Sequence, residues 1–300
     1  MRKAKRRISQ CSTRNGGSNI VATNEKCIEI PEDEYFSLIR KNRNLSLVKA
    51  FFESFLNYNS KGKMFNVVTK TWNPVTGCLY HCTYCWARQL ATTKLKNSHR
   101  YIQGFKPMLN KNEFRVKFKK GGLIFVSDMG DLFGDFIPNH WIQRVLEHVA
   151  RFPKTHFLFL TKNPARYHDV LRQMPENAIL GATIETNDDQ IFLTSKASRA
   201  PLPSKRYTAM RDLDWDKKFV SIEPVLDFKL ETFSLWIEDI LPFMVYVGYD
   251  NYHNKLNEPP LSKTLSLLDR ISQNTLVIKK TIRQAWFEIS HKNLGDWSEQ

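Results

Sequence analysis

The sequence predicts an α/β fold: a complete or partial (β/α) barrel of about six or seven parallel strands, preceded by a basic, partly helical extension. From residue 65 onward, short apolar runs rich in β-branched and aromatic residues alternate with amphipathic stretches. The runs are apolar on both faces, which is typical of strands in a parallel sheet covered by helices. No G-x-G-x-x-G fingerprint opens a helix, so a barrel is favoured over an open dinucleotide-binding sheet.

The elements follow from these patterns. The expected strands are residues 65–70, 122–127, 156–161, 179–184, 218–223, 243–248 and 275–280. Stretches of helical character lie between most of them, at 86–96, 138–151, 164–173, 187–197, 229–241 and 261–272. Barrel enzymes place their chemistry at the carboxyl ends of the strands. The polar residues that end each run are therefore the ones to inspect for a site.

Three regions are expected along the chain. Residues 1–60 form a basic extension, of which the first 25 are polar enough to be predicted disordered. Within it, residues 31–58 begin at a proline and carry apolar residues at roughly helical spacing, which predicts a helical segment. Residues 61–290 are predicted to form the barrel, and residues 291–300 a C-terminal tail.

Positive charge is concentrated in the first part of the chain. Residues 1–120 hold 24 Lys and Arg against 7 Asp and Glu, whereas residues 121–300 hold 21 against 23. The densest stretch is 86–120, with ten cations and one acid. Such a one-sided field attracts polyanions, which makes DNA or RNA a possible partner. A lysine-rich solvated surface without a partner is the alternative.

The sequence predicts a cytoplasmic protein without a membrane partner. No apolar run reaches the roughly 18–20 residues that a membrane-spanning helix needs. The basic N-terminus, MRKAKRR, is not followed by the apolar segment of a secretory signal. Of the five cysteines, three lie within eight residues, a spacing that indicates a metal site rather than a disulfide framework.

The clustered cysteines follow the first expected strand. Cys78, Cys82 and Cys85 have the spacing C-x3-C-x2-C. Three thiolates on one tight loop can each ligate one iron of a cubane [4Fe–4S] cluster. The fourth iron is then left without a protein ligand, so a small molecule can coordinate it.

Other interpretations of the cysteines stay open at this stage. Zinc prefers four ligands, usually in paired C-x2-C halves. His81 lies between two of the cysteines, and Cys11 and Cys27 of the extension are further potential ligands. A structural metal of this kind would suit a nucleic-acid-binding protein without radical chemistry. Buried cysteines without any metal are the remaining alternative.

The cysteine loop resembles the defining motif of the radical S-adenosylmethionine superfamily. Further segments are similar to one branch of it, common in phage and prokaryotic genomes and without an assigned reaction, which is distantly similar to spore photoproduct lyase. These segments are WNPVTGC at 72–78, SDMGDLF at 127–133, FLTKNPAR at 159–166, GATIETN at 181–187 and SIEPVLDF at 221–228. The resemblance implies a [4Fe–4S] cluster, S-adenosylmethionine, its reductive cleavage to a 5′-deoxyadenosyl radical, and an electron donor of flavodoxin or ferredoxin type. The chain departs from the branch at 247–251 and 279–281, which leaves its substrate open.

The same resemblance assigns expected roles near the cofactor. Tyr84, before the last cysteine, would lie near the adenine. Asp128, Gly130 and Asp131 follow the second strand, near where the superfamily binds the methionine amino group. For Asp128 a helix N-cap is the structural alternative. Gly130 would allow the backbone to approach the ligand closely.

The later strand ends add further expected site residues. Lys162 could pair with the cofactor carboxylate, as a matching lysine does in the photoproduct lyase branch, or lie on the surface. Thr183, Glu185 and Asn187 end the fourth strand, and Glu185 is suited to accept hydrogen bonds from two ribose hydroxyls, or to begin a helix as an acid in its first turn. Glu223 interrupts an apolar run, and a carboxylate at that depth needs a partner.

Overall fold

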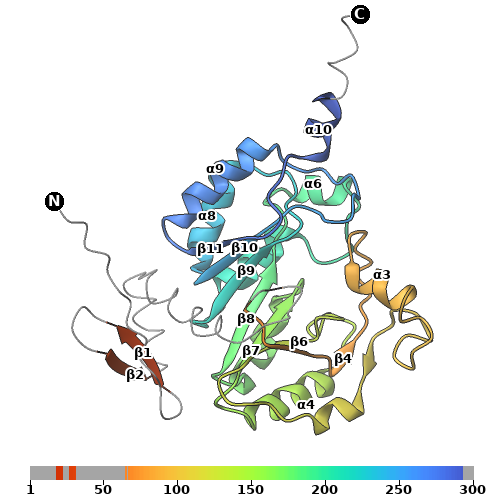
Figure 1. The fold of residues 1–300 in the computed structure, drawn as a ribbon, viewed down its shortest axis with the longest axis vertical. Helices are drawn as coiled ribbons and strands as arrows, with labels where there is room; N and C mark the ends of the chain where they lie inside the picture. The colour runs from red at the N-terminus through yellow and green to blue at the C-terminus, as the bar shows by residue number, and fades with distance from the viewer. Residues whose placement is uncertain (1–17, 23–26, 32–64, 66, 293–300) are drawn as a thin grey trace, which may run out of the picture.

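The computed structural model describes residues 18–22, 27–31, 65 and 67–292 (Figure 1). Strands β1 (Ser18–Ala22) and β2 (Cys27–Pro31) form an antiparallel hairpin. The expectation of disorder is wrong for residues 18–22, where the β-branched pair Ile20 and Val21 favours a strand. The helical segment expected over 31–58 lies outside the described residues except for its first residue, which ends β2. The division at residue 60 stays a prediction.

Seven parallel strands form the main sheet, in the order β3-β6-β7-β8-β9-β10-β11. They are β3 (Lys70–Trp72), β6 (Leu123–Val126), β7 (His156–Thr161), β8 (Ala178–Thr183), β9 (Lys218–Ile222), β10 (Met244–Val247) and β11 (Leu276–Lys279). Their order in space follows their order in the chain, as in a (β/α) barrel. Within the described ranges β3 and β11 do not pair with each other, so the barrel is partial.

Helices connect most of these strands. They are α3 (Trp86–Thr92), α4 (Asn139–Ala150), α5 (Ala165–Val170), α6 (Asp189–Thr194), α7 (Pro203–Arg211), α8 (Leu230–Ile240), α9 (Leu261–Ser272) and α10 (Trp286–Lys292). Two 3-10 turns, η1 (Lys111–Arg115) and η2 (Leu171–Gln173), and a short antiparallel pair, β4 (Val75–Thr76) with β5 (Met108–Leu109), complete the fold.

The two faces of the sheet bury different cores. Residues of α4, α8 and α9 share one cluster with alternate residues of the strands, which defines the outer face. The other face, here called the inner face, carries Phe125, Phe219 and Tyr246, against which Phe65 packs. Because side chains alternate along a strand, every second residue of each strand belongs to the inner face.

The predicted fold class is confirmed, in its partial form. Six of the seven expected strands lie within two residues of the observed ones. The first is wrong: residues 65–69 precede β3, which begins at Lys70, because Phe65, Val67 and Val68 fill the inner face of the sheet rather than extend it. In the described ranges no helix combines the length and apolarity of a membrane span.

Candidate active site

The polar residues that end neighbouring strands share the inner face. Thr183 of β8 pairs in register with Ser221 of β9, which pairs with Tyr246 of β10. Since Tyr246 packs in the core on the inner face of the sheet, the residues in register with it, Ser221 and Thr183, face the same side. Two residues further on, Glu185 and Glu223 follow on the same face. The strand ends therefore meet as the sequence predicts.

The cysteine loop is fixed to the same edge of the sheet by backbone contacts. Gly77 donates its N–H to the carbonyl of Met129 at 2.9 Å and forms an isolated parallel bridge with Gly130. Cys78 donates its N–H to the carbonyl of Phe105 at 3.0 Å. These bonds hold the loop between the end of β6 and the segment after α3.

The expected close approach at Gly130 is to protein backbone. A Cβ atom there would lie 2.9 Å from the carbonyl oxygen of Gly77. Gly77 has φ +84°, and a Cβ on it would lie 2.1 Å from the carbonyl oxygen of Lys106. Both glycines are needed because backbone segments cross here.

Each of the three thiols has a polar neighbour directed at its sulfur. The N–H of Tyr80 donates to Cys78 Sγ at 3.5 Å, and the N–H of Arg88 donates to Cys85 Sγ at 3.3 Å. The hydroxyl of Ser198 lies 3.1 Å from Cys82 Sγ. The cysteines are free thiols, and all three pack in one cluster with Tyr80. Hydrogen bonds to sulfur favour its charged form.

Burial works against that charge in the metal-free protein. It raises the pKa of Cys78 far above its usual value, with a further contribution from Asp131 and then from the other two cysteines. Burial also raises the pKa of Cys85. Among the described residues, no group of three or more His, Cys, Asp or Glu side chains is arranged to hold a single metal ion. In a cubane, by contrast, each thiolate ligates a different iron.

Glu185 is the centre of a buried polar network, here called the Glu185 network. Its side chain is fully buried, and it accepts hydrogen bonds at 2.6 Å from the hydroxyl of Tyr84, from Lys162 Nζ and from Arg206 Nη1. Burial alone raises the pKa of a carboxylate. The charges of Arg206 and Lys162, with the hydrogen bonds from Lys162 and Tyr84, outweigh it and lower the pKa of Glu185 to about 2.

The network joins three elements to the cysteine loop. Tyr84 belongs to that loop, Lys162 follows β7, Glu185 follows β8, and Arg206 lies on α7. Arg206 also donates to the carbonyl oxygens of Pro201 and Thr183. Its other terminal nitrogen, Nη2, is buried without a hydrogen-bond partner. Both acceptor oxygens of Glu185 are thus already engaged by protein groups.

Asp131 supports the adjacent strand end. It accepts hydrogen bonds from the Thr161 hydroxyl at 2.6 Å, from the Lys162 N–H at 2.9 Å and from the Phe133 N–H at 3.1 Å. Burial nevertheless raises its pKa, and these bonds only partly oppose the effect. Asp131 thereby orients the backbone from which Lys162 reaches Glu185.

Asp128 and Asn187 are held by loops rather than by helix starts. Asn73, in the WNPVTGC segment, donates to Asp128 at 2.6 Å and accepts from the N–H of Met129 at 3.0 Å. Burial raises the pKa of Asp128. Asn187 makes two hydrogen bonds to the backbone of Lys229. The N-cap of α4 is Pro138 and that of α6 is Asp188, so the capping alternatives for Asp128 and Glu185 are wrong.

Glu223 forms an ion pair with Lys280, the residue that directly follows the last strand. Lys280 Nζ lies 2.9 Å from Glu223 Oε1 and 3.2 Å from Oε2, and the hydroxyl of Ser221 donates to Oε2 at 3.2 Å. This cluster lies on β9 and just after β11. It is separate from the Glu185 network, which lies around β7 and β8.

Sequence reasoning missed three residues of the site. Arg206 lies in a stretch interrupted by Pro201 and Pro203, Ser198 carries no motif signal, and Asn73 belongs to the WNPVTGC motif without a role of its own. Pro203 at the first turn of a helix is a signal that could have predicted α7, although not the contact of Arg206 with Glu185.

The fold and site define the class: a partial (β/α) barrel with a three-cysteine loop at the carboxyl edge of its sheet. The chain belongs to the family described as "Protein of unknown function (DUF5131)", whose profile matches residues 64–248. No curated protein sequence matches it.

Solved structures with a similar fold are distant in sequence. A mutant spore photoproduct lyase with bound AdoMet and dinucleoside spore photoproduct has 11% identity and a TM-score of 0.48, over 80% of this chain and 78% of that one. Streptococcus suis SuiB bound to S-adenosylmethionine has 12% identity and a TM-score of 0.45, over 86% and 67%. SuiB bound to its precursor peptide SuiA has 12% identity and a TM-score of 0.45, over 92% and 71%.

Proposed function

We propose that this protein is a radical S-adenosylmethionine enzyme that holds a [4Fe–4S] cluster on Cys78, Cys82 and Cys85. The observation that carries the proposal is the convergence of three free thiols on one backbone-anchored loop at the carboxyl edge of a parallel sheet. When bound, the cluster would supply an electron that breaks a C–S bond of S-adenosylmethionine.

The donor set fits such a cluster. Three thiols supply three iron ligands, and each sulfur has an N–H or hydroxyl neighbour that stabilises its charge. Burial raises the pKa of the Cys78 and Cys85 thiols, and a bound metal would keep such thiols deprotonated. Structural zinc prefers four protein ligands, whereas the loop offers three thiols, which favours iron over structural zinc.

The chain's own residues would orient the cofactor and keep water out. Lys162, beside the ring of Tyr84, and the neighbouring Thr183 offer hydrogen-bond donors on the inner face. Glu185 holds Lys162 and Tyr84 in place through their hydrogen bonds to its carboxylate, and its hydrogen bond to a cofactor ribose remains part of the proposal. An electron donor of flavodoxin or ferredoxin type and a cytoplasmic location remain part of the proposal.

Anaerobic reconstitution with iron and sulfide tests the function. We expect four irons per chain, visible thiolate-to-iron charge-transfer absorbance, and release of 5′-deoxyadenosine from S-adenosylmethionine once dithionite is added. Cys82→Ala should remove both the cluster and the product. The matched controls are Cys11→Ser and Cys27→Ser, which should keep both. Zinc in protein purified without air, or a cluster that never cleaves S-adenosylmethionine, would contradict the proposal.

A further inference from the structure

The connection between α6 and α7 runs alongside the cysteine loop. The N–H of Thr83 donates to the carbonyl of Ala197 at 2.9 Å, and the N–H of Arg199 donates to the carbonyl of Tyr80 at 2.7 Å. One backbone hydrogen bond thus runs in each direction between the two stretches of chain. Residues 197–200, here called the 197–200 segment, are attached to the cysteine loop through backbone atoms, so the attachment survives a change of side chain.

Further contacts hold the end of this segment. Ala200 packs in one cluster with Tyr80 and Cys82. The carbonyl of Pro201, the next residue, accepts a hydrogen bond from Arg206 Nε at 2.6 Å. Arg206 belongs to the Glu185 network, which also holds the end of the cysteine loop. The segment and the loop are therefore fixed to each other directly and through the same buried network.

Ser198 lies between the two backbone bonds, with its hydroxyl oxygen 3.1 Å from Cys82 Sγ. The same oxygen accepts the N–H of Ala200 at 3.1 Å, which leaves the hydroxyl proton for the sulfur. In the free thiol either atom can donate. A thiolate bound to iron has no proton, so Ser198 has to be the donor once metal is bound.

Cys82 differs from the other two cysteines in its donor and in its burial. Cys78 and Cys85 accept hydrogen bonds from backbone N–H groups, at 3.5 and 3.3 Å. Among the described residues, Cys82 is the cysteine of the loop with a hydroxyl donor, and it is only 8% exposed. A hydrogen bond is stronger where water is excluded. Unlike a backbone donor, the hydroxyl of Ser198 can also be removed by substitution.

We propose that Ser198 is a positioning residue that raises the reduction potential of the cluster through its hydrogen bond to the Cys82 thiolate. Hydrogen bonds to the ligating sulfurs are among the factors that set such potentials. One electron arrives from an external reductant, and the hydroxyl proton stays on Ser198. The sulfur then carries more negative charge, so the hydrogen bond is stronger in the reduced form and stabilises it. The inference rests on the proposed function, because it requires the cluster.

A redox titration of the anaerobically reconstituted protein tests this role. The potential is lowered in steps with dithionite and mediators, without S-adenosylmethionine, and the reduced cluster is quantified by electron paramagnetic resonance. In Ser198→Ala the equilibrium constant for reduction should fall about threefold to tenfold, which lowers the potential of a one-electron couple by about 30–60 mV. An unchanged potential would overturn the inference.

A conservative variant separates the hydroxyl from the shape of the side chain. Ser198→Thr keeps a hydroxyl at the same position and should keep the wild-type potential. If Ser198→Thr shifts the potential as much as Ser198→Ala does, the hydrogen bond is not the cause and the inference fails.

Ser195 provides a matched control within the same connection. Its hydroxyl donates to the carbonyl of Phe192 at 2.8 Å and accepts the N–H of Ala197 at 3.3 Å. Ser195→Ala therefore removes a hydroxyl that supports the 197–200 segment without removing a contact to sulfur, and the potential should stay at the wild-type value. An equal shift in Ser195→Ala would make the effect one of segment geometry and would overturn the inference.

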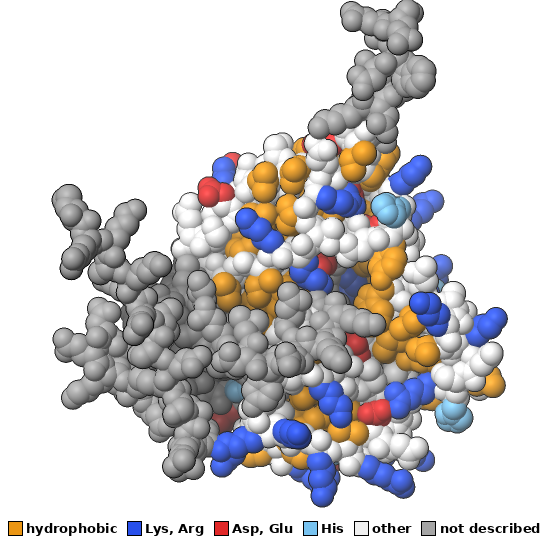
Figure 2. Space-filling view, in the orientation of Figure 1, with side chains coloured by type: hydrophobic (Ala, Val, Ile, Leu, Met, Phe, Trp, Pro, Cys, Tyr) orange, Lys and Arg blue, Asp and Glu red, His pale blue; other side chains and the backbone are white. Residues whose placement is uncertain are grey.

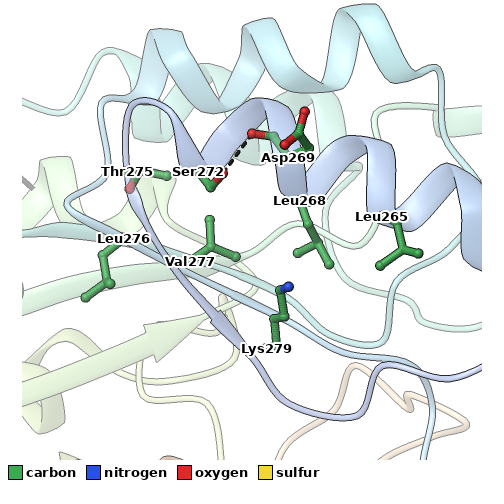
Figure 3. Close-up of a pocket in the computed structure, with 8 residues that line it drawn as sticks. All are labelled: Leu265, Leu268, Asp269, Ser272, Thr275, Leu276, Val277 and Lys279. Carbon is green, nitrogen blue, oxygen red and sulfur yellow. Dashed lines mark hydrogen bonds between the residues drawn. The ribbon is translucent and has the colours of Figure 1, made fainter.

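Ser272 provides a distant control. It lies in the pocket between α9 and β11, where its hydroxyl donates to the carbonyl of Asp269 at 2.8 Å (Figure 3). In the order of strands, β11 is at the opposite end of the sheet from β3, after which the chain enters the cysteine loop. Ser272→Ala should leave the potential unchanged, and a shift as large as that of Ser198→Ala would contradict a local cause.

Surface charge cannot produce the expected difference. Net charge also affects the potential of an iron–sulfur cluster, and Figure 2 shows Lys and Arg side chains on the part of this face that α3 occupies in Figure 1. Replacing serine by alanine or threonine changes no charge. These cations therefore contribute equally to the wild-type protein and to all four variants.

The inference and the proposed function fail separately. A cluster with the same potential in wild type and Ser198→Ala would overturn only the inference. A shifted potential without release of 5′-deoxyadenosine in the wild type would overturn only the radical reaction, and a wild-type chain that assembles no cluster would overturn both. Loss of iron from Ser198→Ala but not from Ser195→Ala would make Ser198 necessary for cluster assembly and would overturn its role in setting the potential.

Discussion

The hydroxyl of Tyr84, two residues after Cys82, lies 2.6 Å from Oε1 of Glu185 at the end of β8. This bond connects the cysteine loop to the interior of the sheet. Lys162 donates to the same oxygen, and its ammonium group lies 5.2 Å from the centre of the Tyr84 ring. A buried carboxylate thus holds the end of the loop, in addition to the backbone bonds of Gly77 and Cys78 at its start.

Tyr84→Phe should therefore destabilise the loop. A hydrogen bond to a charged group contributes about 1.5–3 kcal/mol, and we expect a loss of this size in the free energy of unfolding measured with denaturant. Tyr246→Phe is the control, because it removes a buried hydroxyl without a partner. It should be neutral or slightly stabilising. Equal losses in both variants would show that the Tyr84 bond contributes nothing specific.

Arg206 should matter more than any exposed arginine of the same helix. Arg206→Met leaves Glu185 with one cation instead of two, and breaking a buried pair costs about 3–5 kcal/mol. Arg211, also on α7, forms an exposed ion pair with Asp212, and Arg211→Met should change stability little. Thermal and denaturant unfolding would measure both. Similar effects in the two variants would contradict a special role for the buried pair.

The pH dependence of stability should carry the signature of Glu185. Its pKa is about 2 in the folded protein and about 4.5 in the unfolded chain. Because the pKa of Glu185 is lower in the folded protein, its ionised carboxylate stabilises the fold fully above pH 4.5. This stabilisation is lost as the pH falls toward 2. The difference in unfolding free energy between wild type and Glu185→Gln should shrink over this window, by roughly 3 kcal/mol in total. The exposed Glu147→Gln on α4 serves as control. A constant difference between wild type and Glu185→Gln from pH 6 to pH 3 would contradict this prediction.

Local patterns in the sequence predict the strands and the face on which Lys162, Glu185 and Glu223 lie. Both follow from the twofold alternation of side chains and the rule that strand ends meet at one edge. A cationic partner for Glu223 could also be expected, since a carboxylate largely removed from water requires one.

Pairings between distant segments could not be predicted in this way. Arg206 reaches Glu185 from a helix 21 residues later in the chain, and nothing in the spacing specifies that approach. The run at 65–70 has strand composition, but its apolar side chains fill the inner face instead. Whether such an apolar run pairs as a strand or packs against a face of the sheet depends on where the complete fold buries its side chains.

The glycine at position 77 offers a test of how the cysteine loop is held. Gly77 and Gly104 both have positive φ, +84° and +78°, so an alanine at either position pays a similar backbone penalty of about 1–2 kcal/mol. They differ in space: a Cβ on Gly77 would lie 2.1 Å from the Lys106 carbonyl oxygen, whereas nothing lies within 4 Å of a Cβ on Gly104. Gly77→Ala must therefore displace the backbone next to Cys78, and we expect both a larger loss of stability and a lower iron content after reconstitution. Gly104→Ala should lose only the stability that corresponds to the backbone penalty, and it should bind iron normally. If the two variants retain the same iron, the crossing at Gly77 does not set the position of the first thiol.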